Sequence, residues 1–368
     1  MNSSYKAEVY PITLEKHPNA DTLSIIKIDD YTYVAKTEEW KNVKKAVFIM
    51  PDSLVNTDKP EFNFLKRSKQ WERVKAKKIR GCISYGVLIP VEDEAIIGED
   101  RWDKLEIKHY DPEITNDPSN KKDHLLKEQS GKAPKGCYPK YDLDNFQKYG
   151  RKAFEEGELC FVSEKVNGEN SRYIYQNSEY FCGSRGQWKN EFSKPPNITV
   201  EQLVAAGKTL EQAESIYNIK VLNHRTYKSK WWGIFEQYMG IKKFITDFEN
   251  YVLYGEIFGS NKNMKYGCKD NELRFAAFDI MKPDGKWLDV EEFLEKCNKY
   301  EVPHVPIIAR SIPFNFEEIL NLASGPSLFP GANHYREGIV IKPLKERWHE
   351  KYGRVCLKCV SAEYLEKN

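Results

Sequence analysis

The chain has 368 residues, of which 40% are hydrophobic and 30% charged, a balance ordinary for a soluble protein. The formal net charge is only +2, so nucleic acid could bind only through local basic patches. No stretch approaches the ~20 apolar residues that span a bilayer, and residues 1–10 do not resemble a signal peptide. We therefore expect no membrane partner, reduced cysteines, and a cytoplasmic protein, or one in a host's cytoplasm if the gene is viral.

Residues 1–110 contain short strand-like runs separated by turn residues. The runs are 7–12, 23–28, 31–35, 45–49 and 86–91. Many short strands at even spacing predict a β-barrel or sandwich. Segments 14–23, with its turn His17-Pro18-Asn19-Ala20, and 77–88, a basic strand-turn-strand, resemble the OB-fold domain of tRNA-binding modules. A generic β-barrel with a proline turn is the alternative.

Residues 111–150 are dominated by proline, glycine and charge, and hydrophobic periodicity lapses there. This composition predicts a linker between two domains. The run 138–143 is expected to dock onto the following domain, although a plain linker would have the same composition.

Residues 151–368 predict an α+β domain. Strand-like runs are 159–165, 171–176, 251–258, 273–280, 338–341 and 354–360, and helical patterns are 200–217, 231–250 and 290–300. In the first helical pattern, Leu203, Ala206, Leu210 and Ala213 fall on one face.

Four short segments of this domain join a charged residue to a strand-like run. They are Glu164 to Gly168, Tyr254 to Gly259, Glu337 to Lys342, and Leu357 with Lys358. A lysine that ends a strand before a glycine turn, as Lys165 does, can project its amine into a cleft. To attack a phosphate that amine must lose its proton, which burial and neighbouring positive charge favour.

In this order and at these spacings, the four segments resemble the motifs of the covalent nucleotidyltransferase superfamily of polynucleotide ligases and mRNA-capping enzymes. The chain is similar to the clade of ATP-dependent, nick-sealing RNA ligases with an N-terminal OB domain. The chain ends ten residues past Lys358, so we expect no C-terminal OB domain of the kind that DNA ligases and capping enzymes carry.

The resemblance implies a multidomain fold. In that fold, residues 1–110 form a β-barrel (OB-fold), and residues 111–150 form a linker. Residues 151–368 then form an α+β nucleotidyltransferase domain of ATP-grasp-like ligase type. The resemblance implies that Lys165 becomes lysyl-AMP and that the enzyme seals 3′-OH/5′-phosphate breaks in nicked duplex RNA or RNA/DNA hybrid. The implied cofactors are ATP and Mg²⁺ or Mn²⁺, and the implied partner is nucleic acid with an RNA 3′-OH at a nick. A monomer is the expectation from the family.

The resemblance also assigns roles to side chains. It places Glu337 near the metal, through water. Asn167 occupies a place that relatives fill with Asp, His or Asn, and Val360 stands where relatives often carry a second lysine. Glu337 and Lys342 are five residues apart, so a regular strand would point them to opposite faces. The residues assigned to the nucleotide are Glu164, Asn167, Asn170, Arg172, Arg185, Glu256, Phe278, Lys342 and Lys358.

A basic cluster in the N-terminal domain is a candidate RNA-binding surface. Positive charge near aromatic residues suits a surface that follows a phosphate backbone. The cluster consists of Lys75, Lys77, Lys78 and Arg80. Two other functions remain open: an RNA-binding OB-fold protein with an inactive transferase domain, and a capping-type guanylyltransferase that uses GTP.

Overall fold

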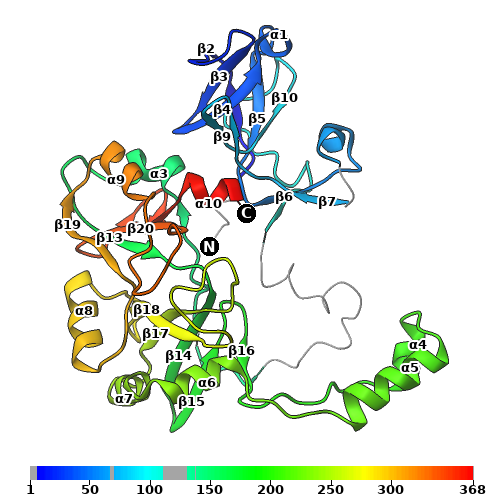
Figure 1. Cartoon of the computed structure of the whole chain (residues 1–368), viewed down its shortest axis with the longest axis vertical. Coiled ribbons are helices and arrows are strands. Elements are labelled where there is room, and N and C mark those ends of the chain that lie inside the picture. Colours follow the sequence, from blue (N-terminus) through cyan, green and yellow to red (C-terminus); the bar gives the residue numbers. More distant parts are fainter. Residues whose placement is uncertain (1–5, 67–69, 111–130, 137, 368) are drawn as a thin grey trace.

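The chain forms an N-terminal β domain and a larger C-terminal α+β domain, with helix α10 (Ala362–Lys367) lying between them (Figure 1). The computed structural model describes residues 6–66, 70–110, 131–136 and 138–367. Within these ranges no helix combines the length and the apolar character needed to cross a bilayer. Of the expected linker, residues 111–130 and 137 lie outside the described residues.

The N-terminal domain is built from short antiparallel strands around β5 (Lys45–Ile49), which lies between β1 (Val9–Pro11) and β10 (Val87–Pro90). Val47 and Ile49 pack into one hydrophobic cluster, whereas Ala46 and Phe48 pack into another. Because β5 is buried on both faces beyond its first residue, its sequence from Ala46 to Ile49 is apolar rather than alternating. The remaining elements are β2 (Leu14–Lys16), β3 (Leu23–Ile28), β4 (Tyr31–Lys36), α1 (Thr37–Trp40), β6 (Ser53–Asn56), η1 (Pro60–Leu65), β7 (Trp71–Arg73), β8 (Lys77–Ile79), β9 (Cys82–Ser84) and β11 (Lys108–His109).

The two segments that resemble an OB module are in direct contact. Strands β8 and β9 form a hairpin whose turn residues, Arg80 and Gly81, both have positive φ, of 49° and 88°. The side chain of Asn19 donates a hydrogen bond to the carbonyl of Arg80 at 2.9 Å, and His17 Nε2 lies 3.3 Å from the carbonyl of Ile79. The proline turn therefore holds the basic hairpin in place.

The C-terminal domain contains two five-stranded sheets. One has the order β12 (Asp144–Asn145), β23 (Leu357–Val360), β20 (Gly338–Pro343), β13 (Leu159–Lys165) and β19 (Ile307–Pro313). The other has the order β16 (Trp188–Lys189), β15 (Glu179–Gly183), β14 (Glu169–Gln176), β17 (Val252–Phe258) and β18 (Arg274–Met281). The chain passes from the first sheet to the second between Lys165 and Glu169. A small hairpin, β21 (Trp348–His349) and β22 (Gly353–Arg354), precedes β23.

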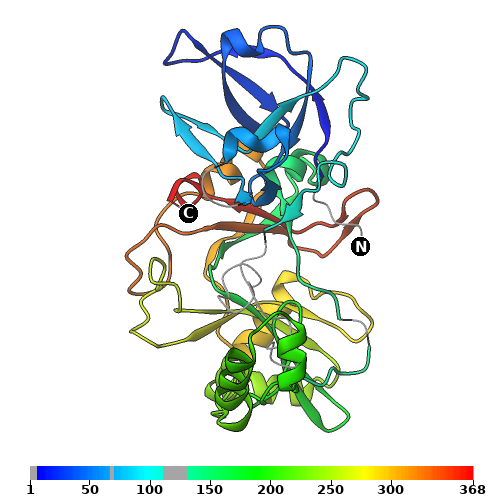
Figure 2. The ribbon, with the colours of Figure 1, turned by 90° about the vertical axis from the view of Figure 1, so that its right-hand side faces the viewer.

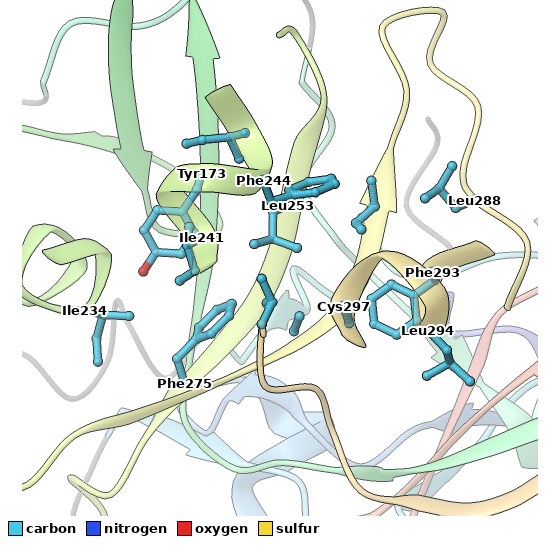
Figure 3. Close-up of a cluster of buried hydrophobic side chains, with 14 of the residues drawn as sticks. Tyr173, Ile234, Ile241, Phe244, Leu253, Phe275, Leu288, Phe293, Leu294 and Cys297 are labelled. Carbon is cyan, nitrogen blue, oxygen red and sulfur yellow. The ribbon is translucent and has the colours of Figure 1, made fainter. Parts of the chain in front are cut away.

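Each sheet has its own helical cover. Helices α3 (Phe146–Ala153) and α9 (Phe316–Leu322) pack on the first sheet. Helices α6 (Lys230–Gln237), α7 (Met239–Asp247) and α8 (Val290–Lys299) contribute to the core of the second, where Phe244, Phe275 and Phe293 are almost fully buried (Figure 3). Burial of each such ring stabilises the fold by roughly 1.5–3 kcal/mol. The core therefore holds the strands of the second sheet, and the site residues that they carry, in fixed positions.

Two of the expected helices are wrong in extent, since each is interrupted. The pattern 200–217 divides into α4 (Val200–Ala205) and α5 (Leu210–Tyr217), because Gly207 has a φ of 89° and Thr209 begins a new helix with a capping box. A π-helical turn, η4 (Asn218–Leu222), follows α5. These helices form an arm that projects from the domain in Figure 1 and lies in front of it in the view of Figure 2. The pattern 231–250 likewise breaks at Tyr238, between α6 and α7.

Candidate active site

Lys165 is the last residue of β13 and lies where the chain leaves the first sheet. Its Nζ donates a hydrogen bond to Glu337 Oε1 at 2.6 Å, and the Lys165 side chain is 24% exposed. Glu337 is brought to it because Lys165 is the register partner of Gly338. The lysine that the sequence predicts as nucleophile is therefore fixed at one end by its strand and at the other by a carboxylate.

Alternation along the strands explains which side chains face the site. In β13, Cys160 and Val162 pack into the core of the first sheet, whereas Phe161 packs with the second. The same period of two places Lys165 on the side of Phe161. In β23, Leu357 and Cys359 enter the core, and Lys358, which stands between them in the sequence, lines the cavity.

Glu337 and Lys342 both reach this region despite their odd separation. Glu337 immediately precedes β20 and contacts Lys165, whereas Lys342 lies within β20 and lines the same cavity as Lys165. Because Glu337 is outside the regular strand, the alternation that governs β20 does not fix its direction. A regular strand would have pointed the side chains of Glu337 and Lys342 to opposite faces of the sheet. In the structure both side chains lie in the region of Lys165.

The glycines of three motifs lie where neighbouring chain leaves no room for a side chain. A Cβ on Gly168 would lie 2.2 Å from the carbonyl oxygen of Ile257, and one on Gly338 would lie 2.1 Å from that of Cys359. A Cβ on Gly255 would lie 2.1 Å from the ring of Phe275. The glycines thus allow the strands that carry Lys165, Glu256 and Glu337 to approach closely.

Substitution of Gly168 by alanine is expected to slow any reaction of Lys165 by at least about tenfold, because the turn must move away from a backbone atom and a displacement of the order of 1 Å can cost 10²-fold. Gly186 is the matched control, because a Cβ there would meet no atom within 4 Å. The rate of covalent labelling at Lys165 should fall for Gly168→Ala and remain unchanged for Gly186→Ala. Equal rates in the two variants would contradict the steric argument.

A single cavity gathers most of the predicted nucleotide-binding residues. Glu164, Lys165, Asn170, Arg185, Glu256, Phe278, Lys342 and Lys358 all line it. Its wall also includes residues that sequence reasoning did not assign, namely His109 from the N-terminal domain and Tyr141, Asp142 and Leu143 from the segment before β12. The cavity therefore draws on both sheets, on the docked end of the expected linker, and on the N-terminal domain.

The cationic side chains of the cavity differ in how they are held. Arg185 pairs with Asp142 at 2.5 Å. Lys342 is 3% exposed and lies 3.2 Å from Asp279 and 3.3 Å from Glu346. Lys358 lies near enough to His109 to lower its pKa. Besides Lys165, the site thus contains three positive groups, of the kind that bind phosphate through charge-assisted hydrogen bonds.

Asp279 is the centre of a buried ion network beneath the cavity. It is fully buried, accepts a hydrogen bond from Tyr141 at 2.7 Å, and pairs with Arg354 at 2.6 Å as well as with Lys342. Burial alone would raise the pKa of Asp279, but Arg354 and Lys342 outweigh it and lower that pKa. A carboxylate inside the apolar run 275–280 is the signal that could have identified it, since such a group must be paired.

Three predicted residues each have at least one polar atom that is hydrogen-bonded within the protein. Arg172 donates to the carbonyl of Tyr138 at 3.1 Å and lies over the ring of Trp188, and it does not line the cavity. The carboxylate of Glu164 accepts the backbone N–H of Leu328 at 2.7 Å. Asn167 is hydrogen-bonded at its backbone N–H and at both ends of its side-chain amide. Asn170, in contrast, lines the cavity with a buried Oδ1 that accepts no hydrogen bond from the described residues.

His109 is the residue of the N-terminal domain that lines the cavity. It belongs to β11, which pairs with β6. Burial, together with the charges of Lys358 and Arg185, lowers its pKa to about 4, so the imidazole is neutral at pH 7. Its position depends on contact between two domains, and nothing in the local sequence around it indicates a binding site.

The predicted RNA-binding residues lie outside the cavity. Lys75, Lys77, Lys78 and Arg80 are all exposed or partly exposed, on or beside the β8–β9 hairpin. The hairpin packs near α10, and Lys78 lies 3.9 Å from Glu366 of that helix. The cluster therefore forms a separate basic surface on the N-terminal domain.

Glu337 has the properties of a carboxylate that could hold a divalent cation. Its Oε2 is buried and accepts no hydrogen bond from the part of the chain that the structure describes. No set of three or more metal-binding side chains occurs among those residues. One carboxylate with substrate phosphates and water is a usual environment for Mg²⁺, so the residues present fit such an ion.

The RNA ligase family model matches residues 158–360, and an OB-fold domain model matches residues 9–91. The first match covers more than half of the chain, which therefore belongs to the RNA ligase family. The two matches confirm the predicted order of an OB-fold domain followed by a ligase nucleotidyltransferase domain.

Solved structures of an RNA ligase from Naegleria gruberi have the same fold. A mutant of that ligase with ATP and Mn has a TM-score of 0.73 and 21% identity, with 98% of each chain covered. Another mutant, with AMP and Mn, has a TM-score of 0.73 and 21% identity over 99% of each chain. The same ligase with PPi gives a TM-score of 0.72 and 20% identity, covering 99% of this chain and 98% of that one. No curated protein matches the chain.

Proposed function

We propose that the protein is an ATP-dependent RNA ligase that joins 3′-OH and 5′-phosphate ends through a lysyl-AMP intermediate. The observation that carries this proposal is the placement of Lys165. Its amine lies 2.6 Å from Glu337, and Lys165 lines a cavity that also contains Arg185, Lys342 and Lys358. A nucleophilic amine within a cluster of cations suits attack on a phosphate. The Naegleria ligase structures, with ATP, AMP or PPi, support the choice of nucleotide.

In the first step, Lys165 Nζ attacks the α-phosphorus of ATP. A P–N bond forms, the bond to the bridging oxygen breaks, pyrophosphate leaves, and the amine loses a proton. Lys358 and Arg185 would stabilise the negative charge that develops on the phosphate oxygens. A Mg²⁺ or Mn²⁺ ion held by Glu337 through water would supply further positive charge beside the phosphates.

The nucleoside would lie against Phe278, a partly buried ring on β18 that lines the cavity. Tyr141 packs on Phe278 with ring centroids 4.5 Å apart, which fixes the aromatic wall. Glu256 on β17 faces the same cavity and would accept hydrogen bonds from the ribose hydroxyls.

In the later steps, AMP passes from Lys165 to the 5′-phosphate of a broken strand, with cleavage of the P–N bond. The 3′-OH of the other strand then attacks that phosphate and expels AMP. The proposed substrate is a nick in duplex RNA or in an RNA/DNA hybrid, with RNA at the 3′-OH side. We also propose that the enzyme acts as a monomer in the cytoplasm.

Incubation of the protein with α-labelled ATP, or separately with α-labelled GTP, followed by denaturing electrophoresis, tests this proposal against its alternatives. Label from ATP alone is expected. Label from GTP alone would indicate a capping-type guanylyltransferase instead. If neither nucleotide labels a protein that is folded and free of bound AMP, an inactive transferase domain attached to an RNA-binding OB domain would be the better account.

Charge reversal on the β8–β9 hairpin is expected to weaken binding to nicked duplex without slowing lysyl-AMP formation. A Lys77→Glu, Arg80→Glu double variant should bind the nicked duplex at least about tenfold less tightly. The slope of log K against log salt concentration should become shallower by about 1 for each cation that no longer neutralises a phosphate. Binding would be measured at several salt concentrations. Lys41→Glu, Lys44→Glu is a matched control, near α1 at the far end of the same domain (Figure 1). Equal weakening in the two variants would exclude a specific role for the hairpin.

A further inference from the structure

Two tyrosine hydroxyls accept hydrogen bonds from Asn167, which lies two residues after Lys165 in the sequence. The backbone N–H of Asn167 donates to the hydroxyl of Tyr266 at 2.7 Å, and its Nδ2 donates to the hydroxyl of Tyr364 at 2.9 Å. Asn261 Nδ2 donates to Asn167 Oδ1 at 2.7 Å. The turn from Lys165 to Gly168 is therefore anchored from two directions besides its own strands.

Tyr266 is held firmly in the orientation that this contact requires. It is fully buried, and its ring lies among those of Phe258, Phe329 and His334, with centroids 5.4, 5.1 and 4.6 Å away. Its φ is 52°, a conformation that bulky residues rarely adopt outside strained or functional sites. The surrounding rings and this backbone conformation together aim the hydroxyl at the turn.

Tyr364 links the same turn to the C-terminal helix. It lies in α10, whose preceding residue, Ser361, donates its backbone N–H to the carbonyl of Glu337 at 2.8 Å. Burial, reinforced by the nearby carboxylate of Glu337, raises the pKa of Tyr364 well above its usual value. The hydroxyl therefore stays neutral, and α10 is tied both to the residue that pairs with Lys165 and to the turn that follows Lys165.

We propose that Tyr266 and Tyr364 are positioning residues for lysyl-AMP formation, which fix the turn after Lys165 so that its amine meets the α-phosphate of ATP. This inference rests on the proposed ligase function. Neither tyrosine lines the cavity, so each acts through Asn167 rather than on the substrate. A lysine side chain has four rotatable bonds, and a fixed turn limits the region its amine can explore.

The proposal predicts that Tyr364→Phe slows lysyl-AMP formation about tenfold in single-turnover assays, because the substitution keeps the ring but leaves the partly buried amide of Asn167 without its acceptor. Asn167→Ala should have a similar effect. The double variant should be no slower than the slower single variant, because both substitutions remove the same hydrogen bond.

Two readouts separate positioning from general stabilisation. Sealing of a nick that already carries AMP on its 5′-phosphate does not use the Lys165 amine, so Tyr364→Phe should leave that rate unchanged. The KM for ATP should also change little while the rate constant falls. If both reactions slow equally, or if the effects of Tyr364→Phe and Asn167→Ala multiply, the tyrosine acts on the fold and not on the turn.

Tyr335→Phe is the matched control, because Tyr335 is 54% exposed in the segment just before Glu337. It should react at the rate of the unmodified protein. Labelling of Tyr364→Phe at that same rate would overturn the proposal. Failure of the unmodified protein to form lysyl-AMP would instead contradict the ligase function, so the two failures are distinguishable.

Discussion

Replacing Lys165 by methionine is expected to remove all covalent label from α-labelled ATP. Methionine is close to lysine in length but has no amine, so no P–N bond can form. Because Lys165 is the cavity lysine that contacts Glu337, we expect no other side chain to take its place. The measurement is the amount of label retained on the protein after denaturing electrophoresis.

The same variant should still seal a nick whose 5′-phosphate has been adenylylated beforehand, because the last step needs only the 3′-OH and the remaining cavity residues. Lys262→Met is a control, since Lys262 is an exposed lysine in the loop between β17 and β18. It should be labelled as strongly as the unmodified protein. Persistent label on Lys165→Met would show that the nucleophile has been assigned to the wrong residue.

Replacing Asp279 by asparagine is expected to lower the free energy of unfolding by about 3–5 kcal/mol, the usual cost of leaving a buried charge without its partner. Asparagine has nearly the same shape, so the loss would come from the charge. Of the carboxylates in the described part of the chain, Lys342 and Arg354 would then share only Glu346, and all three side chains are largely buried. Urea unfolding, followed by fluorescence, measures the change.

Glu291→Gln is the control for this experiment, because it breaks an exposed, solvent-screened pair with Arg310 and should change the free energy of unfolding little. The pH dependence gives a second check. The pKa of Asp279 is lower in the folded protein, so its stabilising contribution is complete above the unfolded pKa of about 3.9 and is lost as the pH falls below that value. Asp279→Asn should remove this part of the acid dependence. A loss of stability no greater than in the control would show that the network is not needed for the fold.

The parts of the site that could be predicted from the sequence are those carried on strands with a clear pattern. Lys165 ends a strand that begins with an apolar run, and Glu256 and Lys358 stand among apolar residues of their strands, so charged side chains there had to face something other than the core. The glycines beside them reflect the close approach of neighbouring backbone, which is a local requirement. Local patterns of this kind remain visible in one sequence.

The rest of the site depends on contacts between distant segments. His109 and Tyr141 come from the ends of two regions predicted as an OB-fold domain and as a linker that docks onto the next domain, and only the packed domains bring them to the cavity. Tyr364 lies 197 residues from Asn167. The break between α4 and α5 was missed because apolar spacing continues through Gly207, whose positive φ ends the first helix.

The central claim is that the protein joins an RNA 3′-OH to a 5′-phosphate with ATP. It is tested most directly with a nicked duplex whose 5′-phosphate at the nick is radiolabelled and whose 3′-OH side is RNA. After incubation with the protein, ATP and Mg²⁺, the label is expected to be resistant to phosphatase in a strand of the joined length, and Lys165→Met should give none. Label that remains fully sensitive to phosphatase, with a protein that does form lysyl-AMP, would contradict the account.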